Sequence, residues 1–275
     1  MRKDHLSAPL PFVGQKRMFA KEYIKVLGEV KDAKVFVDLF GGSGLLSHIT
    51  KRQRPDATVV YNDYDNYSRR LDNIGRTNIM LDCLRDILAP VPRLKIVPGS
   101  VKKLILDMMA EEEAETGFVD YITLSTSLLF SMKYATTLEE MRRQTMYNRI
   151  RRSGYDAAGY LDGIVVESCD YRELFERYRD RDDVVFLVDP PYLSTDVGTY
   201  SMCWRLSDYL DVLKILVGHR YVYFTSDKSS IVELCDWLGR NKEIGNPFIG
   251  ATRKEFNASM NYNSHYTDIM LCNVA

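Results

Sequence analysis

Short, continuous apolar runs alternate along the chain with segments whose apolar residues recur at helical spacing. Buried strands are predicted at 35–40, 57–63, 163–167, 184–192 and 220–227. Amphipathic helices are predicted at 16–27, after a stiff proline-containing entry, and at 45–52. Strands that alternate with helices indicate an α/β fold with a doubly wound, mostly parallel sheet.

The stretch between the second and third apolar runs departs from this alternation. Helical periodicity continues after Asp63 to about Leu88, and a segment with three prolines in nine residues then stops any helix. Helical segments return in the next sixty residues. The pattern therefore predicts a mostly helical insertion, residues 75–160, within a domain formed by residues 1–74 and 161–275.

The C-terminal tail has strand character in two stretches that are joined by a polar, Asn-rich loop. Two such strands form a hairpin when the loop between them is short and polar. We therefore expect an antiparallel hairpin at one edge of the parallel sheet.

Composition and charge exclude several classes of protein. The 37 Lys and Arg residues balance 38 Asp and Glu residues, so any polyanion must bind a local basic patch. A hydrophobic content of 45% and a charged content of 27% are typical of a folded chain. Because no apolar run reaches the roughly 18 residues of a membrane span and no signal peptide is apparent, we expect a cytoplasmic protein without membrane contact.

The five cysteines are scattered without any CxxC pair, and the four histidines are dispersed. Neither a zinc site nor a disulfide framework is indicated by this spacing. The sequence therefore predicts no metal centre.

A glycine-rich turn, DLFGGSG, follows the first apolar run from Asp38 to Gly44. Glycines let the backbone approach a ligand closely, and the helix that follows directs its positive end at the same place. Asp63 ends the next strand, where an acid typically accepts hydrogen bonds from ribose hydroxyls; a helix N-cap is the alternative. Ser47 stands where a dinucleotide fingerprint has its third glycine, which disfavours NAD or FAD.

The sequence DPPY, from Asp189 to Tyr192, directly follows the fourth apolar run. Its two prolines, Pro190 and Pro191, form a rigid turn at the end of a strand. Methyl transfer to an exocyclic amine needs acceptors for the amino hydrogens and a surface for the base. The Asp189 carboxylate and the Pro190 carbonyl are suitable acceptors, and Tyr192 offers a stacking face. A purely structural turn is the alternative.

The order of these motifs resembles that of the Dam-type (alpha group) DNA adenine methyltransferases, which use S-adenosylmethionine. Further family elements are similar to PFVGQK at 11–16, VVYND at 59–63, ESCDY at 167–171, FTSD at 224–227 and TDIMLCN at 267–273. The resemblance covers about residues 8–74 and 163–275 and implies a Rossmann-like methyltransferase sheet with an inserted target-recognition region. Two departures are Gln15, where the family usually has glycine, and Asp38 in place of a longer glutamate.

The resemblance also implies roles for individual residues. The catalytic residues would be Asp189, Pro190, Pro191 and Tyr192. The cofactor-binding residues would be Phe12, Gly14, Lys16, Asp38, Phe40, Gly42, Gly44, Asp63 and Asp170. Within this set, Phe12, Gly14 and Lys16 would line the methionine end of the cofactor. Asp170 would bind the amino group of its adenine.

A run of five arginines without any acid occupies residues 141–155. If this stretch is helical, Arg142 and Arg149 share one face, and Arg143 and Arg151 nearly share another. Arginines suit phosphates and guanine edges, and interleaved tyrosines can fill the gap left by a flipped base. The predicted DNA-binding residues are Arg142, Arg143, Tyr147, Arg149, Arg151 and Arg152. A solvated helix face that pairs with the acidic run 111–115 is the alternative.

These observations predict a site-specific DNA adenine methyltransferase of the restriction–modification type. It would act on double-stranded DNA as a monomer or weak dimer. It would flip an adenine and transfer the methyl group directly from the cofactor. No proline precedes a cysteine, which disfavours covalent carbon-5 chemistry, and the Asp of DPPY favours adenine over cytosine. An RNA adenine methyltransferase, a DNA cytosine-N(4) methyltransferase and a catalytically silent DNA-binding protein of the same fold are the alternatives.

Overall fold

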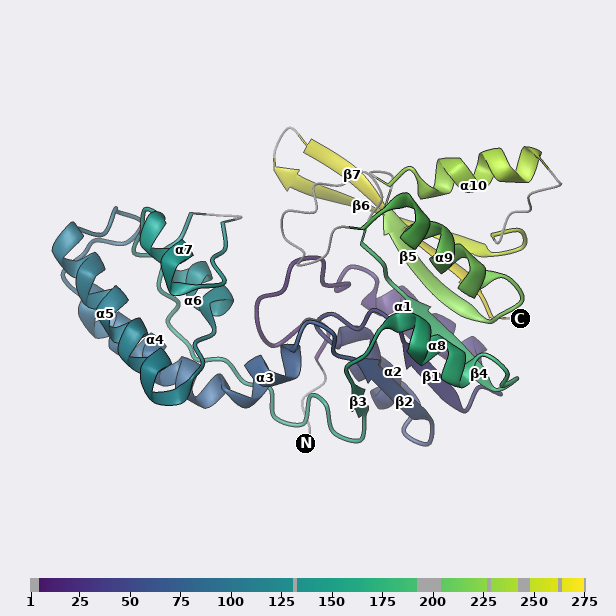
Figure 1. Cartoon of the computed structure of the whole chain (residues 1–275), viewed down its shortest axis with the longest axis horizontal. Coiled ribbons are helices and arrows are strands. Elements are labelled where there is room, and N and C mark those ends of the chain that lie inside the picture. The colour runs from purple at the N-terminus through teal and green to yellow at the C-terminus, as the bar shows by residue number, and fades with distance from the viewer. Residues whose placement is uncertain are drawn as a thin grey trace. The chain divides into compact units, whose positions relative to one another are not determined.

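A computed structural model describes residues 5–130, 133–191, 204–226, 229–241, 248–261 and 264–274. The chain forms two compact units (Figure 1). A sheet-containing unit includes Gly14–Asp65 and Leu161–Ala275, and a helical unit includes Ala8–Val13 and Asn66–Tyr160. Residues 75–160, the predicted insertion, lie within the helical unit.

Within the described residues, the sheet-containing unit is built on seven strands. They are β1 (Val35–Asp38), β2 (Thr58–Asn62), β3 (Val165–Glu167), β4 (Val184–Val188), β5 (Tyr221–Ser226), β6 (Thr252–Asn261) and β7 (Ser264–Asn273). Their order in the sheet is β3-β2-β1-β4-β5-β7-β6. Strand β7 is antiparallel to β5 and β6, whereas all other neighbours are parallel. The predicted doubly wound sheet with an antiparallel C-terminal hairpin is thus confirmed.

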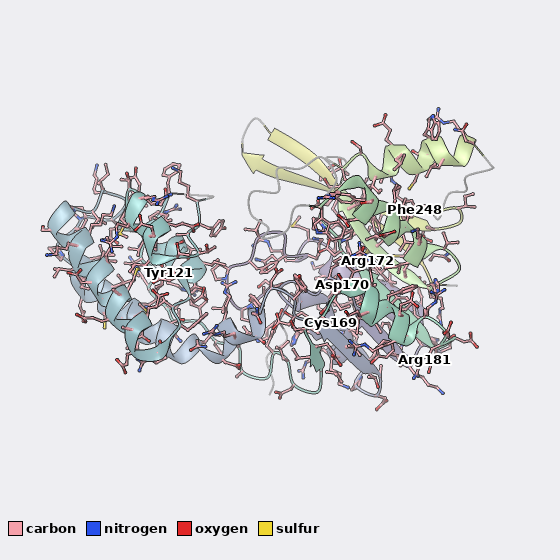
Figure 2. The ribbon with its side chains drawn as sticks, in the orientation of Figure 1. Tyr121, Cys169, Asp170, Arg172, Arg181 and Phe248 are labelled. Carbon is pink, nitrogen blue, oxygen red and sulfur yellow. The ribbon has the colours of Figure 1, made fainter. Side chains whose placement is uncertain are left out.

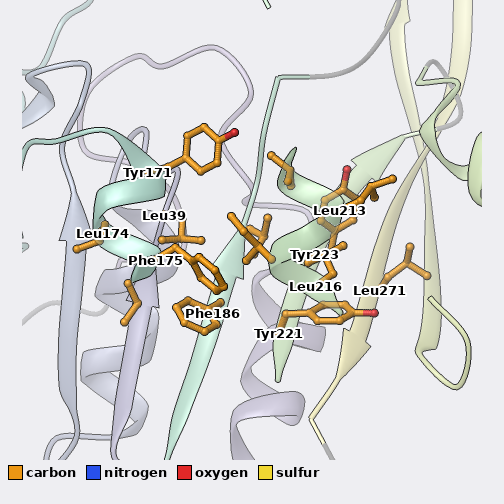
Figure 3. Packing of buried hydrophobic residues seen from close by; sticks show 14 of the residues in the cluster. Leu39, Tyr171, Leu174, Phe175, Phe186, Leu213, Leu216, Tyr221, Tyr223 and Leu271 are labelled. Carbon is orange, nitrogen blue, oxygen red and sulfur yellow. The ribbon is translucent and has the colours of Figure 1, made fainter. Parts of the chain in front are cut away.

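Helices cover both faces of this sheet. They are α1 (Ala20–Glu29), α2 (Leu45–Gln53), α8 (Tyr171–Tyr178), α9 (Leu206–Leu216) and α10 (Ile231–Arg240). Alternate residues of a strand enter opposite layers: Phe186 of β4 packs with α8, α9 and α10, whereas Leu187 packs with α1 and α2. Figure 3 shows Phe186 beside Phe175 of α8. Burial on both faces explains the continuous apolar runs of the sequence.

The helical unit has its own hydrophobic core. Its helices are α3 (Tyr67–Asp72), α4 (Ile74–Leu88), α5 (Gly99–Thr116), α6 (Tyr121–Leu128) and α7 (Leu138–Arg143). Leu84, Ile105 and Leu124 contribute to this core from α4, α5 and α6. No helix in the described part of the chain has both the length and the apolar character that crossing a bilayer requires.

A buried ion pair joins the start of the helical unit to α6. The Arg70 Nε atom lies 3.1 Å from Asp120 Oδ1, and Asp120 also caps α6 by accepting a hydrogen bond from the backbone of Thr123 at 3.0 Å. The same guanidinium donates to the Pro11 carbonyl at 2.8 Å. Arg70 therefore holds the segment 8–13 within this unit.

The arginine-rich segment is helical only as far as Arg143, so the shared helical faces considered for it do not form. Helix α7 ends at Arg143, and Gln144 is extended. The residues that follow exchange backbone hydrogen bonds with two neighbouring segments: Tyr147 donates to the Leu128 carbonyl at 2.7 Å, and Val97 donates to that of Met146 at 2.9 Å. Because these partners satisfy the backbone in an extended form, the arginines after α7 do not share a helical face with those within it.

Candidate active site

The two acidic motifs meet where the strand order reverses. Strand β1 ends at Asp38, and Asp189 directly follows its neighbour β4. Side-chain alternation places both carboxylates on the face that α1 and α2 cover, because Phe36 and Leu187, two residues earlier, pack there. In open α/β sheets this point, at the carboxyl ends of the strands, is where ligands bind.

Lys16 forms an ion pair with Asp189. The distance from Lys16 Nζ to Asp189 Oδ2 is 2.6 Å, and the two side chains are only 9% and 17% exposed. The ammonium also donates to the Gly14 carbonyl at 2.8 Å. Gly14 has a φ of +81°, a conformation that favours glycine. The structure thus brings Lys16 of the PFVGQK motif to Asp189 of the DPPY motif. The residue predicted to bind the cofactor forms an ion pair with the predicted catalytic carboxylate.

Opposing influences act on Asp189. Burial raises the pKa of its carboxyl group, whereas the charge of Lys16 and its hydrogen bond lower that pKa. The net direction is upward. A carboxylate in this state holds a proton more readily than one on the surface.

Asp38 is fully buried and only partly hydrogen-bonded. Its Oδ2 accepts from the Ser47 hydroxyl at 2.7 Å, whereas Oδ1 has no hydrogen-bond partner among the described residues. Burial raises the pKa of Asp38 to about 7, against the hydrogen bond from Ser47. Ser47, at the position where a dinucleotide fingerprint has its third glycine, therefore binds the Asp38 carboxylate through its hydroxyl. An open buried carboxylate oxygen suits an N–H donor or a cation.

The raised pKa of Asp38 predicts a pH-dependent stability. Because the folded protein keeps Asp38 protonated to about pH 7 while the unfolded chain ionises near 3.8, its contribution to the free energy of unfolding is full below pH 4 and is lost as the pH rises to about 7. Asp38→Asn should remove this pH-dependent contribution to the free energy of unfolding, which is on the order of 1–3 kcal/mol between pH 5 and pH 8. Denaturant unfolding of both proteins at pH 5 and pH 8 measures it, and an equal change in both would contradict the assignment.

Tyr61 joins the glycine-rich turn to Asp63. Its hydroxyl lies 2.8 Å from both the Gly42 carbonyl and Asp63 Oδ1, close enough to donate to either. A Cβ on Gly41 would lie 2.1 Å from Tyr61 Cδ2, so the turn is pressed against this ring. The sequence reasoning missed Tyr61 and Gly41. The spacing could have indicated Tyr61, because a residue two positions before Asp63 in a strand lies on the same face of β2.

Gly42 and Gly44, the glycines predicted to shape the cofactor turn, have φ angles of +50° and +70°. Residues other than glycine rarely adopt this left-handed conformation. Gly44 lies at the N-terminus of α2. The conformation of the turn therefore requires glycine at both positions.

Asp63 itself is buried at the end of β2 and is not a helix N-cap. The next helix, α3, begins at Tyr67, and Asn66 occupies its N-cap position. The structural alternative for Asp63 is therefore wrong. Its assignment to the cofactor ribose stays a prediction.

Asn62, another residue that the sequence reasoning missed, links the end of β1 to the ESCDY segment. Its amide nitrogen donates to the Leu39 carbonyl at 3.1 Å and to the Cys169 carbonyl at 3.0 Å. Its oxygen accepts from the Cys169 backbone at 3.1 Å. Asn62 therefore fixes the loop before α8 against the glycine-rich turn.

Asp170 is the N-cap of α8. Its side chain accepts from the backbone of Arg172 at 2.8 Å, and its second oxygen lies 3.4 Å from the Arg172 guanidinium. Figure 2 shows both residues at the start of α8, beside Cys169. The carboxylate is partly exposed, and the predicted contact to a cofactor adenine is not tested by this geometry.

Phe40 belongs to an aromatic cluster at the end of β1. Its ring centroid lies 4.8 Å from that of Tyr171 and 5.7 Å from that of Trp204. Tyr171 and Trp204 stack at 5.8 Å with an interplanar angle of 20°. Neither Tyr171 nor Trp204 was among the predicted site residues. Their rings provide flat apolar surface next to the glycine-rich turn.

The remaining predicted residues are Phe12, Pro190, Pro191 and Tyr192. Phe12 belongs to the helical unit, where its ring meets that of Tyr67 edge-on at 5.6 Å. Tyr192 lies outside the described residues, whereas Pro190 and Pro191 directly follow Asp189, and Pro190 is buried.

The predicted DNA-binding residues are dispersed within the helical unit. Arg142 and Arg143 pair with Glu139 at 3.5 and 3.1 Å, and the Arg151 guanidinium lies 3.6 Å from the centroid of the Tyr155 ring. Arg149 donates to the Leu129 carbonyl at 3.2 Å, Tyr147 has its ring 6.0 Å from that of Phe130, and Arg152 is exposed. The acidic run proposed as an alternative partner pairs elsewhere: Glu112 and Glu115 bind Arg76.

Comparison with known proteins gives the family. A protein of Haemophilus influenzae described as "Putative methyltransferase" is 37% identical over 252 residues, which cover 88% of this chain and 83% of that relative. The chain belongs to this methyltransferase family. No protein-family model matches it. The crystal structure of an rRNA methylase from Streptococcus thermophilus aligns with 93% of this methyltransferase and 96% of its own chain, at 11% identity and a TM-score of 0.35. That similarity is too low to support a substrate.

Proposed function

We propose that this methyltransferase transfers a methyl group from S-adenosylmethionine to the exocyclic amine of an adenine in double-stranded DNA. The observation that carries the proposal is the ion pair between Lys16 and Asp189 together with the unpartnered, buried oxygen of Asp38. One fully buried acid, one largely buried acid and one buried ammonium at the switch point are costly to maintain without a ligand.

The residues present fit this cofactor. S-adenosylmethionine carries an ammonium and a sulfonium, and the unpartnered oxygen of Asp38 would accept a hydrogen bond from the ammonium. Asp63 would accept hydrogen bonds from the ribose, and the ring of Phe40 would contact an apolar part of the cofactor. The bound cofactor supplies the electrophilic methyl group.

The roles of the chain's own residues follow from their contacts. Asp189 would accept a hydrogen of the substrate amine, which localises the lone pair of that nitrogen for attack. Because burial raises its pKa, this carboxylate is also a better acceptor for the proton that the amine releases. Lys16 would orient the carboxylate, since one of its oxygens is held at 2.6 Å.

The choice of adenine in DNA rests on the DPPY motif and on the resemblance in the order of the motifs. Asp at the first motif position favours adenine, and the basic residues of the helical unit offer contacts to phosphates. The chain as a whole is nearly neutral, with a formal charge of −1, so these contacts must be local.

Methyl transfer from cofactor labelled with tritium tests the proposal. Duplex DNA and RNA of the same mixed sequence are incubated with the purified protein, and the labelled nucleosides are separated after digestion. We expect label in N6-methyladenine from duplex DNA. Label in RNA alone would assign RNA as the substrate, and label in N4-methylcytosine would assign cytosine as the target base. Failure of a folded protein to bind the cofactor in calorimetry would indicate a catalytically silent protein.

A further inference from the structure

The loop between α4 and α5 carries an exposed apolar tip, which we define as residues 92–96, Pro-Arg-Leu-Lys-Ile. All five residues are exposed, and Leu94 and Ile96 are 64% and 60% exposed. The flanking residues Val91 and Val97 are buried in the core of the helical unit. Large apolar side chains are thus held in water by a short segment anchored at both ends.

The backbone of the tip is fixed by hydrogen bonds. Leu94 donates to the Asn148 carbonyl at 2.7 Å, and Asn148 donates to the Lys95 carbonyl at 3.0 Å. Lys95 closes a turn by donating to the Pro92 carbonyl at 3.2 Å. The side chain of Asn148 also donates to the Val91 carbonyl at 2.6 Å. Asn148 therefore supports the tip through three bonds, and the exposed side chains project from a rigid base.

Leu94 is held in a strained conformation. Its φ is +65°, in the left-handed region, which costs a residue with a Cβ about 1–2 kcal/mol. The exposed side chain does not recover this cost by packing. Strain that is maintained to display an apolar group points to a role in binding.

Cations without acidic partners surround the apolar residues. Arg93 and Lys95 flank Leu94, and neither forms an ion pair with any described carboxylate. Arg93 donates to the Ile150 carbonyl at 3.0 Å, which places the tip beside Arg151 and Arg152. Arg142 and Arg143, by contrast, are neutralised in part by Glu139. Positive charge without a described ion-pair partner therefore lies at the tip and in the segment next to it.

We propose that the tip binds duplex DNA, with Arg93 and Lys95 on the phosphates and Leu94 wedged between adjacent base pairs. Proteins that deform DNA insert apolar side chains in this way and recover the unstacking cost, a few kcal/mol, through phosphate contacts. The backbone beneath Leu94 must be rigid, because on a mobile segment the side chain would fold back onto the protein. The inference rests on the proposed function, and it names a contact that the arginine run did not include.

Leu94→Asn tests the wedge in the full-length protein. Asn tolerates the left-handed conformation better than Leu, so the variant should fold with an unchanged or higher melting temperature. We expect its affinity for a 25-base-pair duplex, measured by fluorescence anisotropy, to fall by about 5- to 50-fold, as for the loss of one buried apolar anchor. Energy transfer between dyes at the duplex ends should lose the bend that the parent protein induces.

Three further variants complete the experiment. Leu94→Met keeps an apolar wedge and should bind and bend DNA as the parent does, whereas Ile79→Gln, at an equally exposed apolar residue of α4, should change neither. Arg93→Gln with Lys95→Gln should lower the slope of log affinity against log salt by about 1 for each charge.

Equal binding and bending by the Leu94→Asn variant would overturn the wedge while leaving the proposed function intact. Absence of DNA binding and methylation in the parent protein would overturn both. Tighter binding of single-stranded DNA than of the duplex by the parent would also contradict a wedge, which needs stacked base pairs.

Discussion

Asp189→Asn is expected to lower the rate of methyl transfer by roughly 10²- to 10⁴-fold, the range of a proton acceptor placed at the reacting group. The amide keeps the shape of the side chain but presents an N–H to either Lys16 or the substrate amine. It also removes the negative charge that balances Lys16, whose Nζ lies 2.6 Å from the carboxylate. Cofactor affinity should change far less than the rate, because the methyl acceptor and not the cofactor is the partner of this group.

A matched control lies at the other end of the same strand. Asp183 directly precedes β4, and its carboxylate pairs with Arg181 at 3.0 Å near the surface. Asp183→Asn should retain at least about half of the parent activity, since exposed ion pairs contribute little. Single-turnover rates and calorimetric affinities of both variants separate the effects. An Asp189→Asn protein with the parent rate would refute the catalytic assignment.

Gly41→Ala is expected to abolish measurable cofactor binding at normal assay concentrations. The added Cβ would lie 2.1 Å from Tyr61 Cδ2 and 2.8 Å from the Asn62 carbonyl oxygen. Neither neighbour can yield freely, because Tyr61 is fully buried and its hydroxyl contacts Gly42 and Asp63. Overpacking of this kind costs about 1–3 kcal/mol of stability and displaces the turn.

Gly28→Ala is the control for this substitution. Gly28 lies in α1 of the same unit, and a Cβ there would have no heavy atom within 4 Å. The variant should be more stable by up to about 1 kcal/mol, because alanine is the better helix former. Melting temperatures and cofactor titrations of both variants distinguish a local clash at Gly41 from a general intolerance of alanine in place of glycine. Parent-like cofactor binding by Gly41→Ala would show that the turn is not constrained by Tyr61.

The strands could be predicted because burial on both faces leaves an unambiguous signal. Continuous apolar runs located β1, β2, β4 and β5, and their alternation with helices predicted a mostly parallel sheet. The hairpin of β6 and β7 was predicted from its polar loop. Both acidic motifs were predicted to follow strands, and Asp38 and Asp189 lie at the carboxyl ends of the neighbouring strands β1 and β4.

Contacts between distant segments could not be predicted in the same way. The shared faces considered for Arg142 and Arg149 require a helix, but α7 ends at Arg143, and the residues that follow form backbone hydrogen bonds with residues distant in sequence. Tyr61 and Asn62 were overlooked because a tyrosine or asparagine in a strand carries no motif. Their importance depends on which carbonyls lie beside them in the folded chain.

The central claim is tested most directly by sequencing DNA from cells that lack adenine methylation and express either the parent protein or the Asp189→Asn variant. Methylation-sensitive sequencing reports the modified base, the strand and the surrounding motif together. We predict N6-methyladenine within one short motif in cells with the parent protein and none in cells with the variant. Unmodified adenine in both, with folded and cofactor-binding protein present, would contradict the account.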